Sequence, residues 1–137
     1  MMDLKSSMFV SAAGMKAQGE RIKMISQNIA NSDSTAQTPG GEPFRRKVLT
    51  FKNYLDRNVD ARVVKVDKIG SDKSDFELRY DPGHPAANAD GYVLMPNVNT
   101  MIEMADMREA QRSYEANLSV IDISRTLMMR TIQILRG

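Results

Sequence analysis

The chain contains neither proline nor glycine from Asn97 to Arg136. Because these two residues are the strongest helix breakers, the sequence predicts one uninterrupted helix over 98–136, with Asn97 or Asn99 as its N-cap. At 1.5 Å per residue such a helix is roughly 58 Å long, whereas a compact domain of 137 residues is about 37 Å across. The chain's own fold therefore cannot enclose this helix.

Two apolar stripes follow the predicted C-terminal helix side by side. Both have the 3–4 spacing that keeps residues on one helix face. A two-stranded coiled coil needs only one such seam, so this helix is expected to pack partners on two sides. The first stripe contains Met104, Met107, Tyr114, Leu118, Ile121, Met128, Ile132 and Leu135, and the second contains Ile102, Val120, Ile123 and Leu127.

A further amphipathic helix is predicted over about residues 3–31. Gly14 and Gly19 each lower its helix propensity by about 1 kcal/mol relative to alanine, which a close approach to another helix would explain. The helix is expected to end at Asn31, a residue type that suits a left-handed cap. Its apolar face contains Met8, Ala12, Met15, Ile22 and Ile29.

The middle of the chain differs from both ends in composition. All five prolines and most of the aromatic residues lie between residues 39 and 96, which indicates a small β-rich module. Residues 76–80 alternate in polarity, and 92–94 are expected to return as their hairpin partner. Further strands are expected at 47–51 and 59–66, where the valines change parity and predict a bulge or burial on both faces. Turn-forming composition predicts loops at 37–43 and 69–75.

These features predict an α+β fold in which long N- and C-terminal helices pair as an antiparallel coiled-coil-like hairpin, with a small β-rich module between them. The expected domains are an N-terminal helix at 1–33, a middle module at 34–96 and a long C-terminal helix at 97–137. Two stripes on one helix also predict obligate assembly, so the stripe residues of both helices form the candidate assembly interface.

Composition excludes several classes of function. A net charge of +2 provides little counterion release, so nucleic acid and anionic membranes are not expected partners. The single basic run, at 45–47, is expected to protect a strand edge rather than bind phosphate. The N-terminus lacks the layout of a cleaved signal peptide, and no apolar run approaches membrane-spanning length. With no cysteine and one histidine, we expect no metal site, no cofactor and no small-molecule substrate.

Catalytic groups are scarce as well. His84 is the only imidazole, and Asp81 and Asp90 bracket its loop. The three residues allow a hydrolase as the weakest alternative. Aspartate before proline or glycine is an ordinary turn former, however, and a histidine in a turn is more often a hydrogen-bonding residue than a base. We therefore expect no catalytic residue and no enzyme activity.

Two parts of the chain carry a family resemblance. Residues 11–18 and 27–33 resemble the N-terminal signature of the flagellar rod, hook and axial protein family. Residues 91–99 and 112–118 resemble the C-terminal half of short proximal-rod members of that family. The pairs at 21–22 and 103–104 also match, and in the middle of the chain the resemblance covers only residues 81–85. The matching positions include Asn28, Asn31, Pro96, Asn97 and Asn99.

The resemblance implies a non-enzymatic subunit of the proximal rod of the bacterial flagellar basal body. This hollow periplasmic shaft would transmit torque and conduct exported subunits. The implied partners are further copies of the chain, other proximal and distal rod proteins, the adaptor between the rod and the MS ring, and the flagellar type III export apparatus, through which the chain would pass without cleavage. The same apolar repeats allow an alternative, a self-contained homo-oligomeric coiled-coil adaptor, which a closed oligomer of constant size would favour.

Overall fold

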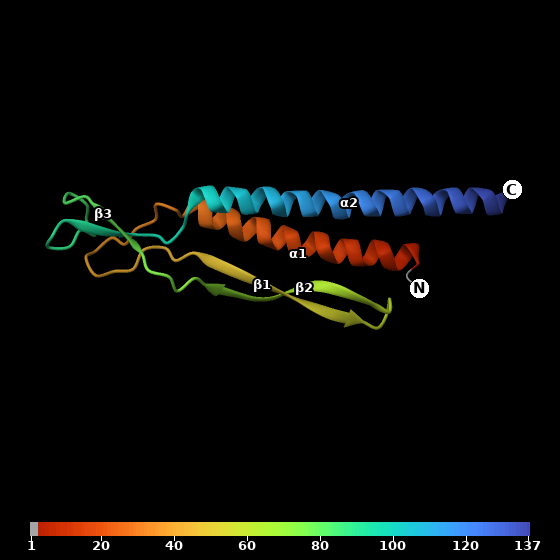
Figure 1. The fold of residues 1–137 in the computed structure, drawn as a ribbon, viewed down its shortest axis with the longest axis horizontal. Coiled ribbons are helices and arrows are strands. Elements are labelled where there is room, and N and C mark those ends of the chain that lie inside the picture. The colour runs from red at the N-terminus through yellow and green to blue at the C-terminus, as the bar shows by residue number, and fades with distance from the viewer. Residues whose placement is uncertain (1–2) are drawn as a thin grey trace. The chain divides into compact units, whose positions relative to one another are not determined.

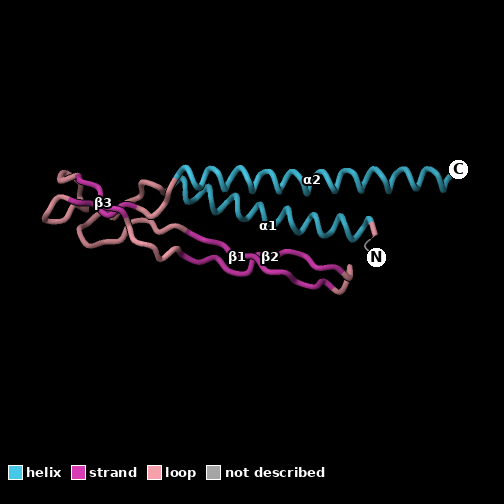
Figure 2. Tube along the Cα trace, in the orientation of Figure 1, coloured by secondary structure: helices cyan, strands magenta, loops and turns pink. Residues whose placement is uncertain are grey.

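The computed structural model describes residues 3–137 and has the element order α1, β1, β2, β3, β4, α2 (Figure 1). Helices form both ends of the chain and the strands lie between them in the sequence, which confirms the predicted α+β class (Figure 2). The residues divide into two compact units. One contains residues up to Ile22, Thr50–Lys68 and Arg108–Gly137, and the other contains Lys23–Leu49 and Ile69–Met107.

Both helices have nearly the predicted bounds. Helix α1 spans Leu4–Ala30, and α2 spans Thr100–Arg136. Of the two candidate N-caps of α2, the structure uses Asn99, whose side-chain Oδ1 accepts the backbone N–H of Met101 at 3.1 Å. This bond satisfies one of the free donors at the start of the helix, and Glu103 lies in the first turn as predicted.

The N-cap of α1 is a residue that the sequence analysis did not single out. The carboxylate of Asp3 accepts the backbone N–H of Ser6 at 2.7 Å. The hydrogen bonds from the backbone and side chain of Ser6 hold the pKa of Asp3 below its ordinary value. An aspartate immediately before an amphipathic run is the sequence signal for this cap.

The end of α1 differs from the prediction, because Asn31 is not a left-handed cap. Among the described residues, Asp60 is the only non-glycine residue with a positive φ, at 50°. Asn31 uses its side chain instead: Nδ2 donates to the carbonyl of Gln27 at 2.8 Å, and Oδ1 accepts the hydroxyl of Ser34 at 3.0 Å. The amide thus ties the last turn of the helix to the following loop without backbone strain.

Strands β1 (Lys47–Asp56) and β2 (Ala61–Ser71) form a two-stranded sheet. Both strands are longer than predicted, and β2 includes the start of the segment expected to be a loop. Ala61 and Val63 are buried, whereas Val64 and Val66 are half-buried. The buried positions change parity along β2, as the valine pattern predicted.

Strands β3 (Glu77–Tyr80) and β4 (Tyr92–Met95) form the predicted antiparallel hairpin. Tyr80 pairs with Tyr92 across the hairpin, and their rings meet edge to face with centroids 5.4 Å apart. Gly91 has a φ of 85°, and a Cβ there would lie 2.9 Å from Cε2 of Tyr80. Both the backbone angle and the neighbouring ring therefore require glycine at this position.

The buried apolar core is small. It consists mainly of alanine and β-branched residues, and it includes Ala17, Met24, Ile25, Ala61, Val63, Val93 and Ala110. Many of the larger apolar side chains, especially on α2, remain exposed. Apolar surface on this scale is unusual for a protein that acts as a monomer.

Candidate assembly surface

The second predicted stripe of α2 is exposed from end to end. Ile102 exposes 55% of its surface and Ile123 exposes 61%, and Val120 and Leu127 are exposed as well. The described part of the chain leaves these four aliphatic side chains in contact with solvent. A line of exposed aliphatic residues along one helix marks a surface that a partner can cover.

The first predicted stripe of α2 divides into two sets. The residues of one set are half-buried and those of the other are exposed. The stripe therefore lies along the border between the covered face of α2 and its open face. The half-buried set is Met107, Tyr114, Ile121 and Met128, and the exposed set is Met104, Leu118, Ile132 and Leu135.

The face of α2 that the chain itself covers lies beside the predicted stripes and not on them. Glu103, Ala110 and Ser124 are buried, and Asn117 is half-buried. These four residues are one heptad apart, and all are small or polar. A search for apolar residues overlooks such a face, but the heptad spacing was a signal that could have identified it.

Gly14 of α1 lies against this covered face. A Cβ at Gly14 would be 2.8 Å from Nδ2 of Asn117, so the prediction that this glycine allows a close approach is confirmed. The same explanation is wrong for Gly19, because no atom lies within 4 Å of the Cβ position there. Gly14 therefore has a packing role that Gly19 lacks.

The covered face of α1 also differs from the stripe read in the sequence. Ala12 is exposed, and the other stripe residues, Met8, Met15, Ile22 and Ile29, are only half-buried. The buried positions lie beside them on the helix. They are Ser11, Gly14, Ala17, Met24, Ile25 and Asn28. The first three of these are small and permit a close backbone approach, whereas Met24 and Ile25 are large side chains buried nearer the end of the helix.

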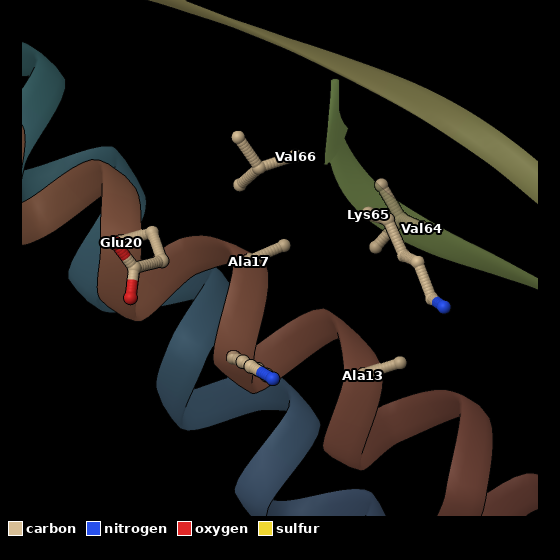
Figure 3. A pocket seen from close by; sticks show the side chains of 7 residues that line it. Ala13, Ala17, Glu20, Val64, Lys65 and Val66 are labelled. Atoms are coloured by element: carbon tan, nitrogen blue, oxygen red, sulfur yellow. The ribbon is translucent and has the colours of Figure 1, made fainter. Parts of the chain in front are cut away.

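An apolar groove lies between α1 and β2, within one compact unit. It has a volume of about 330 Å³. Ala13 and Ala17 line it from the helix, and Val64 and Val66 line it from the strand (Figure 3). Charged side chains, including Lys65, also belong to the lining. We call this cavity the alanine–valine groove.

The family-motif residue Asn28 lies at the centre of a buried polar junction. Its Nδ2 donates to the carbonyl of Lys47 at 2.9 Å, and its Oδ1 accepts the backbone N–H of Lys47 at the same distance. Nδ2 also lies 3.4 Å from Oε2 of Glu103. Asn28 is completely buried. Because its side-chain amide pairs with both backbone groups of Lys47, it provides the hydrogen bonds that a neighbouring strand would provide at the start of β1.

Arg46 neutralises the buried Glu103. The carboxylate of Glu103 is 1% exposed and forms a hydrogen-bonded ion pair with Nε of Arg46. A second carboxylate, that of Asp72, lies 3.4 Å from Nη1 of Arg46. Burial alone lowers the pKa of Arg46, but the hydrogen bond and charge of Glu103, followed by the charge of Asp72, outweigh burial and raise it. No buried side-chain nitrogen or oxygen lacks a partner among residues 3–137.

Asn97 connects the segment before α2 to the same junction. Its Oδ1 accepts the backbone N–H of Arg46 at 2.7 Å, and its Nδ2 donates to the carbonyl groups of Asp72 and Ser74. The backbone and side-chain hydrogen bonds from Ser74 lower the pKa of Asp72, with a smaller contribution from Arg46. Pro96, the residue before Asn97, is buried. The four asparagines of the family motif thus all bind backbone groups at helix ends or loops.

The basic run at 45–47 does not form the solvated strand edge that we expected. The guanidinium of Arg45 lies 4.2 Å from the ring centroid of Phe76, and its Nη1 donates to the carbonyl of Asp72 at 2.8 Å. Arg46 belongs to the polar junction. Both residues find partners far away in the sequence, which local pattern analysis cannot reveal.

The loop between β3 and β4 contains His84, Asp81 and Asp90, the residues of the hydrolase alternative. In this loop the side chain of His84 forms hydrogen bonds that hold the loop. Nδ1 of His84 accepts the backbone N–H of Ala86 at 3.0 Å, and Nε2 lies 3.1 Å from Oγ1 of Thr35. The backbone N–H of His84 also donates to the carbonyl of Asp81. Both ring nitrogens are therefore engaged in holding the loop.

Among residues 3–137, no group of three or more histidine, aspartate or glutamate side chains is arranged to hold a metal ion. Within residues 3–137, no helix combines the length and the apolar character needed to cross a membrane.

Comparison with known proteins identifies the class of this chain. Residues 89–134, which contain β4 and most of α2, match the family model described as flagellar basal body rod FlgEFG protein C-terminal. The chain is a structural protein of the flagellar basal-body rod and not an enzyme.

Full-length relatives make the assignment more specific. The flagellar basal-body rod protein FlgC of Agrobacterium fabrum (strain C58) is 49% identical over 98% of this chain and 96% of that protein. FlgC of Borreliella burgdorferi (strain B31) is 41% identical over 99% of this chain and 100% of its own length, and FlgC of Bacillus subtilis (strain 168) is 39% identical over 93% and 95%. The chain belongs to the flagellar basal-body rod protein FlgC family.

Proposed function

We propose that this chain polymerises as a subunit of the proximal rod of the flagellar basal body. In this proposal the rod is a hollow periplasmic shaft that transmits torque and conducts exported subunits. The observation that carries the proposal is the exposed second stripe of α2 in a chain of the FlgC family. A rod subunit needs such a surface because it contacts several neighbours at once.

The proposed assembly interface consists of the apolar stripes of both helices. The terminal helices are proposed to pair as an antiparallel hairpin, which the close approach of Gly14 to Asn117 supports. The second stripe of α2 then remains open to neighbouring subunits, and the first stripe lies at the border of the covered face. The exposed methionines suit contacts of slightly different geometry, because their side chains are flexible.

The proposed partners follow from the place of the subunit in the rod. They are further copies of the chain, the other proximal and distal rod proteins, and the adaptor that joins the rod to the MS ring. The chain is proposed to reach the rod through the flagellar type III export apparatus. Membership of the FlgC family supports these partners.

A pair of substitutions on α2 tests the proposal. We expect Ile123→Asp and Leu118→Asp to retain the fold, as judged by circular dichroism, because both side chains are already exposed. Cells that carry either variant as their only copy should lose motility, and the protein should be absent from isolated basal bodies. Ser119→Asp introduces the same charge at an exposed position outside the stripes and should leave motility intact.

Two results would contradict the proposal. Normal rods in cells carrying Ile123→Asp would show that the exposed stripe has no part in assembly. A purified chain that forms one closed oligomer of the same size at every concentration would favour a self-contained adaptor over a rod subunit.

A further inference from the structure

We propose that the alanine–valine groove of one copy binds the β3–β4 hairpin of a second copy. This inference rests on the proposed rod function, because it names one of the contacts between subunits. The two surfaces are different parts of the chain. The contact is therefore head to tail, and it can be repeated from copy to copy.

The groove has an apolar floor and basic surroundings. Ala13 and Ala17 leave space beside the half-buried valines of β2, and this space has a volume of about 330 Å³ (Figure 3). Lys16 on α1 and Lys65 on β2 also line the groove, together with one acidic residue, Glu20. The neighbouring parts of both elements are basic as well: 16–23 and 61–68 each contain three basic residues and one acidic residue.

The hairpin has an exposed apolar face. This face consists of two cross-strand pairs: Leu78 pairs with Leu94, and Tyr80 pairs with Tyr92. Leu78 exposes 60% and Tyr80 exposes 65% of its surface. Val93, at an alternate position of the hairpin, is completely buried, so the opposite face is the more deeply covered one. On the exposed face, Leu78, Tyr92 and Leu94 line a shallow cavity with the 36–41 loop. We call the exposed set of Leu78, Tyr80, Tyr92 and Leu94 the hairpin face.

The charges around the hairpin face are opposite to those of the groove. Asp81 follows Tyr80 directly, and Asp90 lies two residues before Tyr92, so both carboxylates flank the aromatic pair. The segment 75–90 contains four acidic residues and one basic residue, Arg79. The acidic end of the hairpin face can therefore meet the lysines of the groove while the aromatic rings contact the valines. Such complementarity determines which surfaces associate and in which orientation.

The groove is an open cavity, and the residues of the hairpin face remain exposed in the folded chain. A second copy supplies both missing surfaces at once. Because the groove of each copy binds the hairpin of the next, the contact can continue through many copies, as a rod lattice requires.

Charge reversal on the full-length chain tests this contact. We expect the groove variant Lys16→Glu/Lys65→Glu and the hairpin variant Asp81→Lys/Asp90→Lys each to weaken self-association by about tenfold or more in sedimentation velocity at low ionic strength. The control Lys23→Glu/Lys68→Glu changes the same charges on the same two elements, outside the groove lining. It should associate like the wild type, and circular dichroism should show that every variant is folded.

A mixture of the two variants gives the most specific result. In an equimolar mixture, the acidic groove of one variant faces the basic hairpin of the other, and the unchanged surfaces also remain complementary. The mixture should therefore associate although neither variant does so alone. Failure of the mixture to associate would overturn the proposal. So would equal effects of the groove variant and its control, or a wild type that stays monomeric up to high concentration.

The docking contact and the rod function can fail separately. If the charge variants associate normally while Ile123→Asp abolishes rod assembly, the groove contact is wrong and the rod function stands. If the charge variants behave as expected but cells carrying Ile123→Asp build normal rods, the proposed role of the α2 stripe is wrong and the docking contact stands.

Discussion

The first and last turns of α2 differ in what stabilises them. In the first turns Asn99 caps the helix, and Glu103 is buried and paired with Arg46. In the last turns every side chain is exposed, and Ile134 and Leu135 expose 79% and 81% of their surfaces. The start of α2 is therefore held by contacts within the chain, whereas the end of α2 is exposed on all sides. An unbroken helix in the sequence does not reveal this change.

Hydrogen exchange should show the largest difference between the two ends. In the purified chain at low concentration, we expect backbone amides at 123–136 to exchange about a hundredfold faster than those at 103–110, because local opening is easiest where tertiary contacts are fewest. Incorporation into rods should slow exchange at 123–136. Equal protection of both segments in a monomer would remove the distinction between them.

Truncation of the buried carboxylate should damage the first turns most. Glu103→Ala leaves Arg46 without its main partner, and we expect the free energy of unfolding in urea to fall by about 3 kcal/mol. Glu109→Ala removes an exposed carboxylate from the same helix and should change it by less than about 0.5 kcal/mol. If both variants lose the same stability, the polar junction is not what holds this end of α2.

Loss of the helix cap should have an intermediate effect. Asn99→Ala removes the acceptor for the backbone N–H of Met101, and we expect it to lower the free energy of unfolding by about 1 kcal/mol. Asn53→Ala, at an exposed position of β1, is the control and should be close to neutral. A neutral Asn99→Ala would show that the start of α2 is fixed by the junction alone.

The two glycines of α1 should respond differently to alanine. Gly19→Ala should raise the free energy of unfolding by up to about 1 kcal/mol, because alanine is the better helix former and nothing occupies the Cβ position. Gly14→Ala gains the same propensity but forces Asn117 to move, so we expect it to be less stable than Gly19→Ala. Equal stability of the two variants would contradict the close approach at Gly14.

Acid should produce the smallest effect. The pKa of Asp72 lies below its ordinary value of 3.8, so its carboxylate stabilises the folded chain above that value, and this contribution is lost as the pH falls through the lowered pKa. Between about pH 5 and pH 2, the wild type should therefore lose more stability than Asp72→Asn. Asp75→Asn is the control and should follow the wild type in urea unfolding at each pH.

The sequence predicted the elements of the fold well. The helix bounds, the β3–β4 hairpin and the parity change in β2 all follow local rules of periodicity and turn formation. The covered faces of the helices were not predicted. Apolar periodicity identifies the most apolar face, whereas this chain covers small and polar residues such as Ala110 and Ser124 and leaves Ile123 exposed.

The polar junction could not be predicted from local patterns either. Arg46 and Glu103 are far apart in the sequence, and each looks like an ordinary surface charge there. The family resemblance identified Asn28 and Asn97 as motif residues, but it did not show that their side chains bind backbone groups of β1 and the adjacent loop. Only the fold brings these groups together.

The double hydrogen bond of Asn28 also limits how the length of α1 can vary. Asn28, near the end of α1, binds Lys47, and Gly14, nearer the start of α1, faces Asn117 of α2. One residue inserted between Gly14 and Asn28 would rotate one of these side chains relative to the other by about 100° about the helix axis, so that both contacts could not form together. Insertions and deletions should therefore be rare between residues 14 and 28 of FlgC-family chains, and common in the turn between β1 and β2, where no helix phase has to be kept.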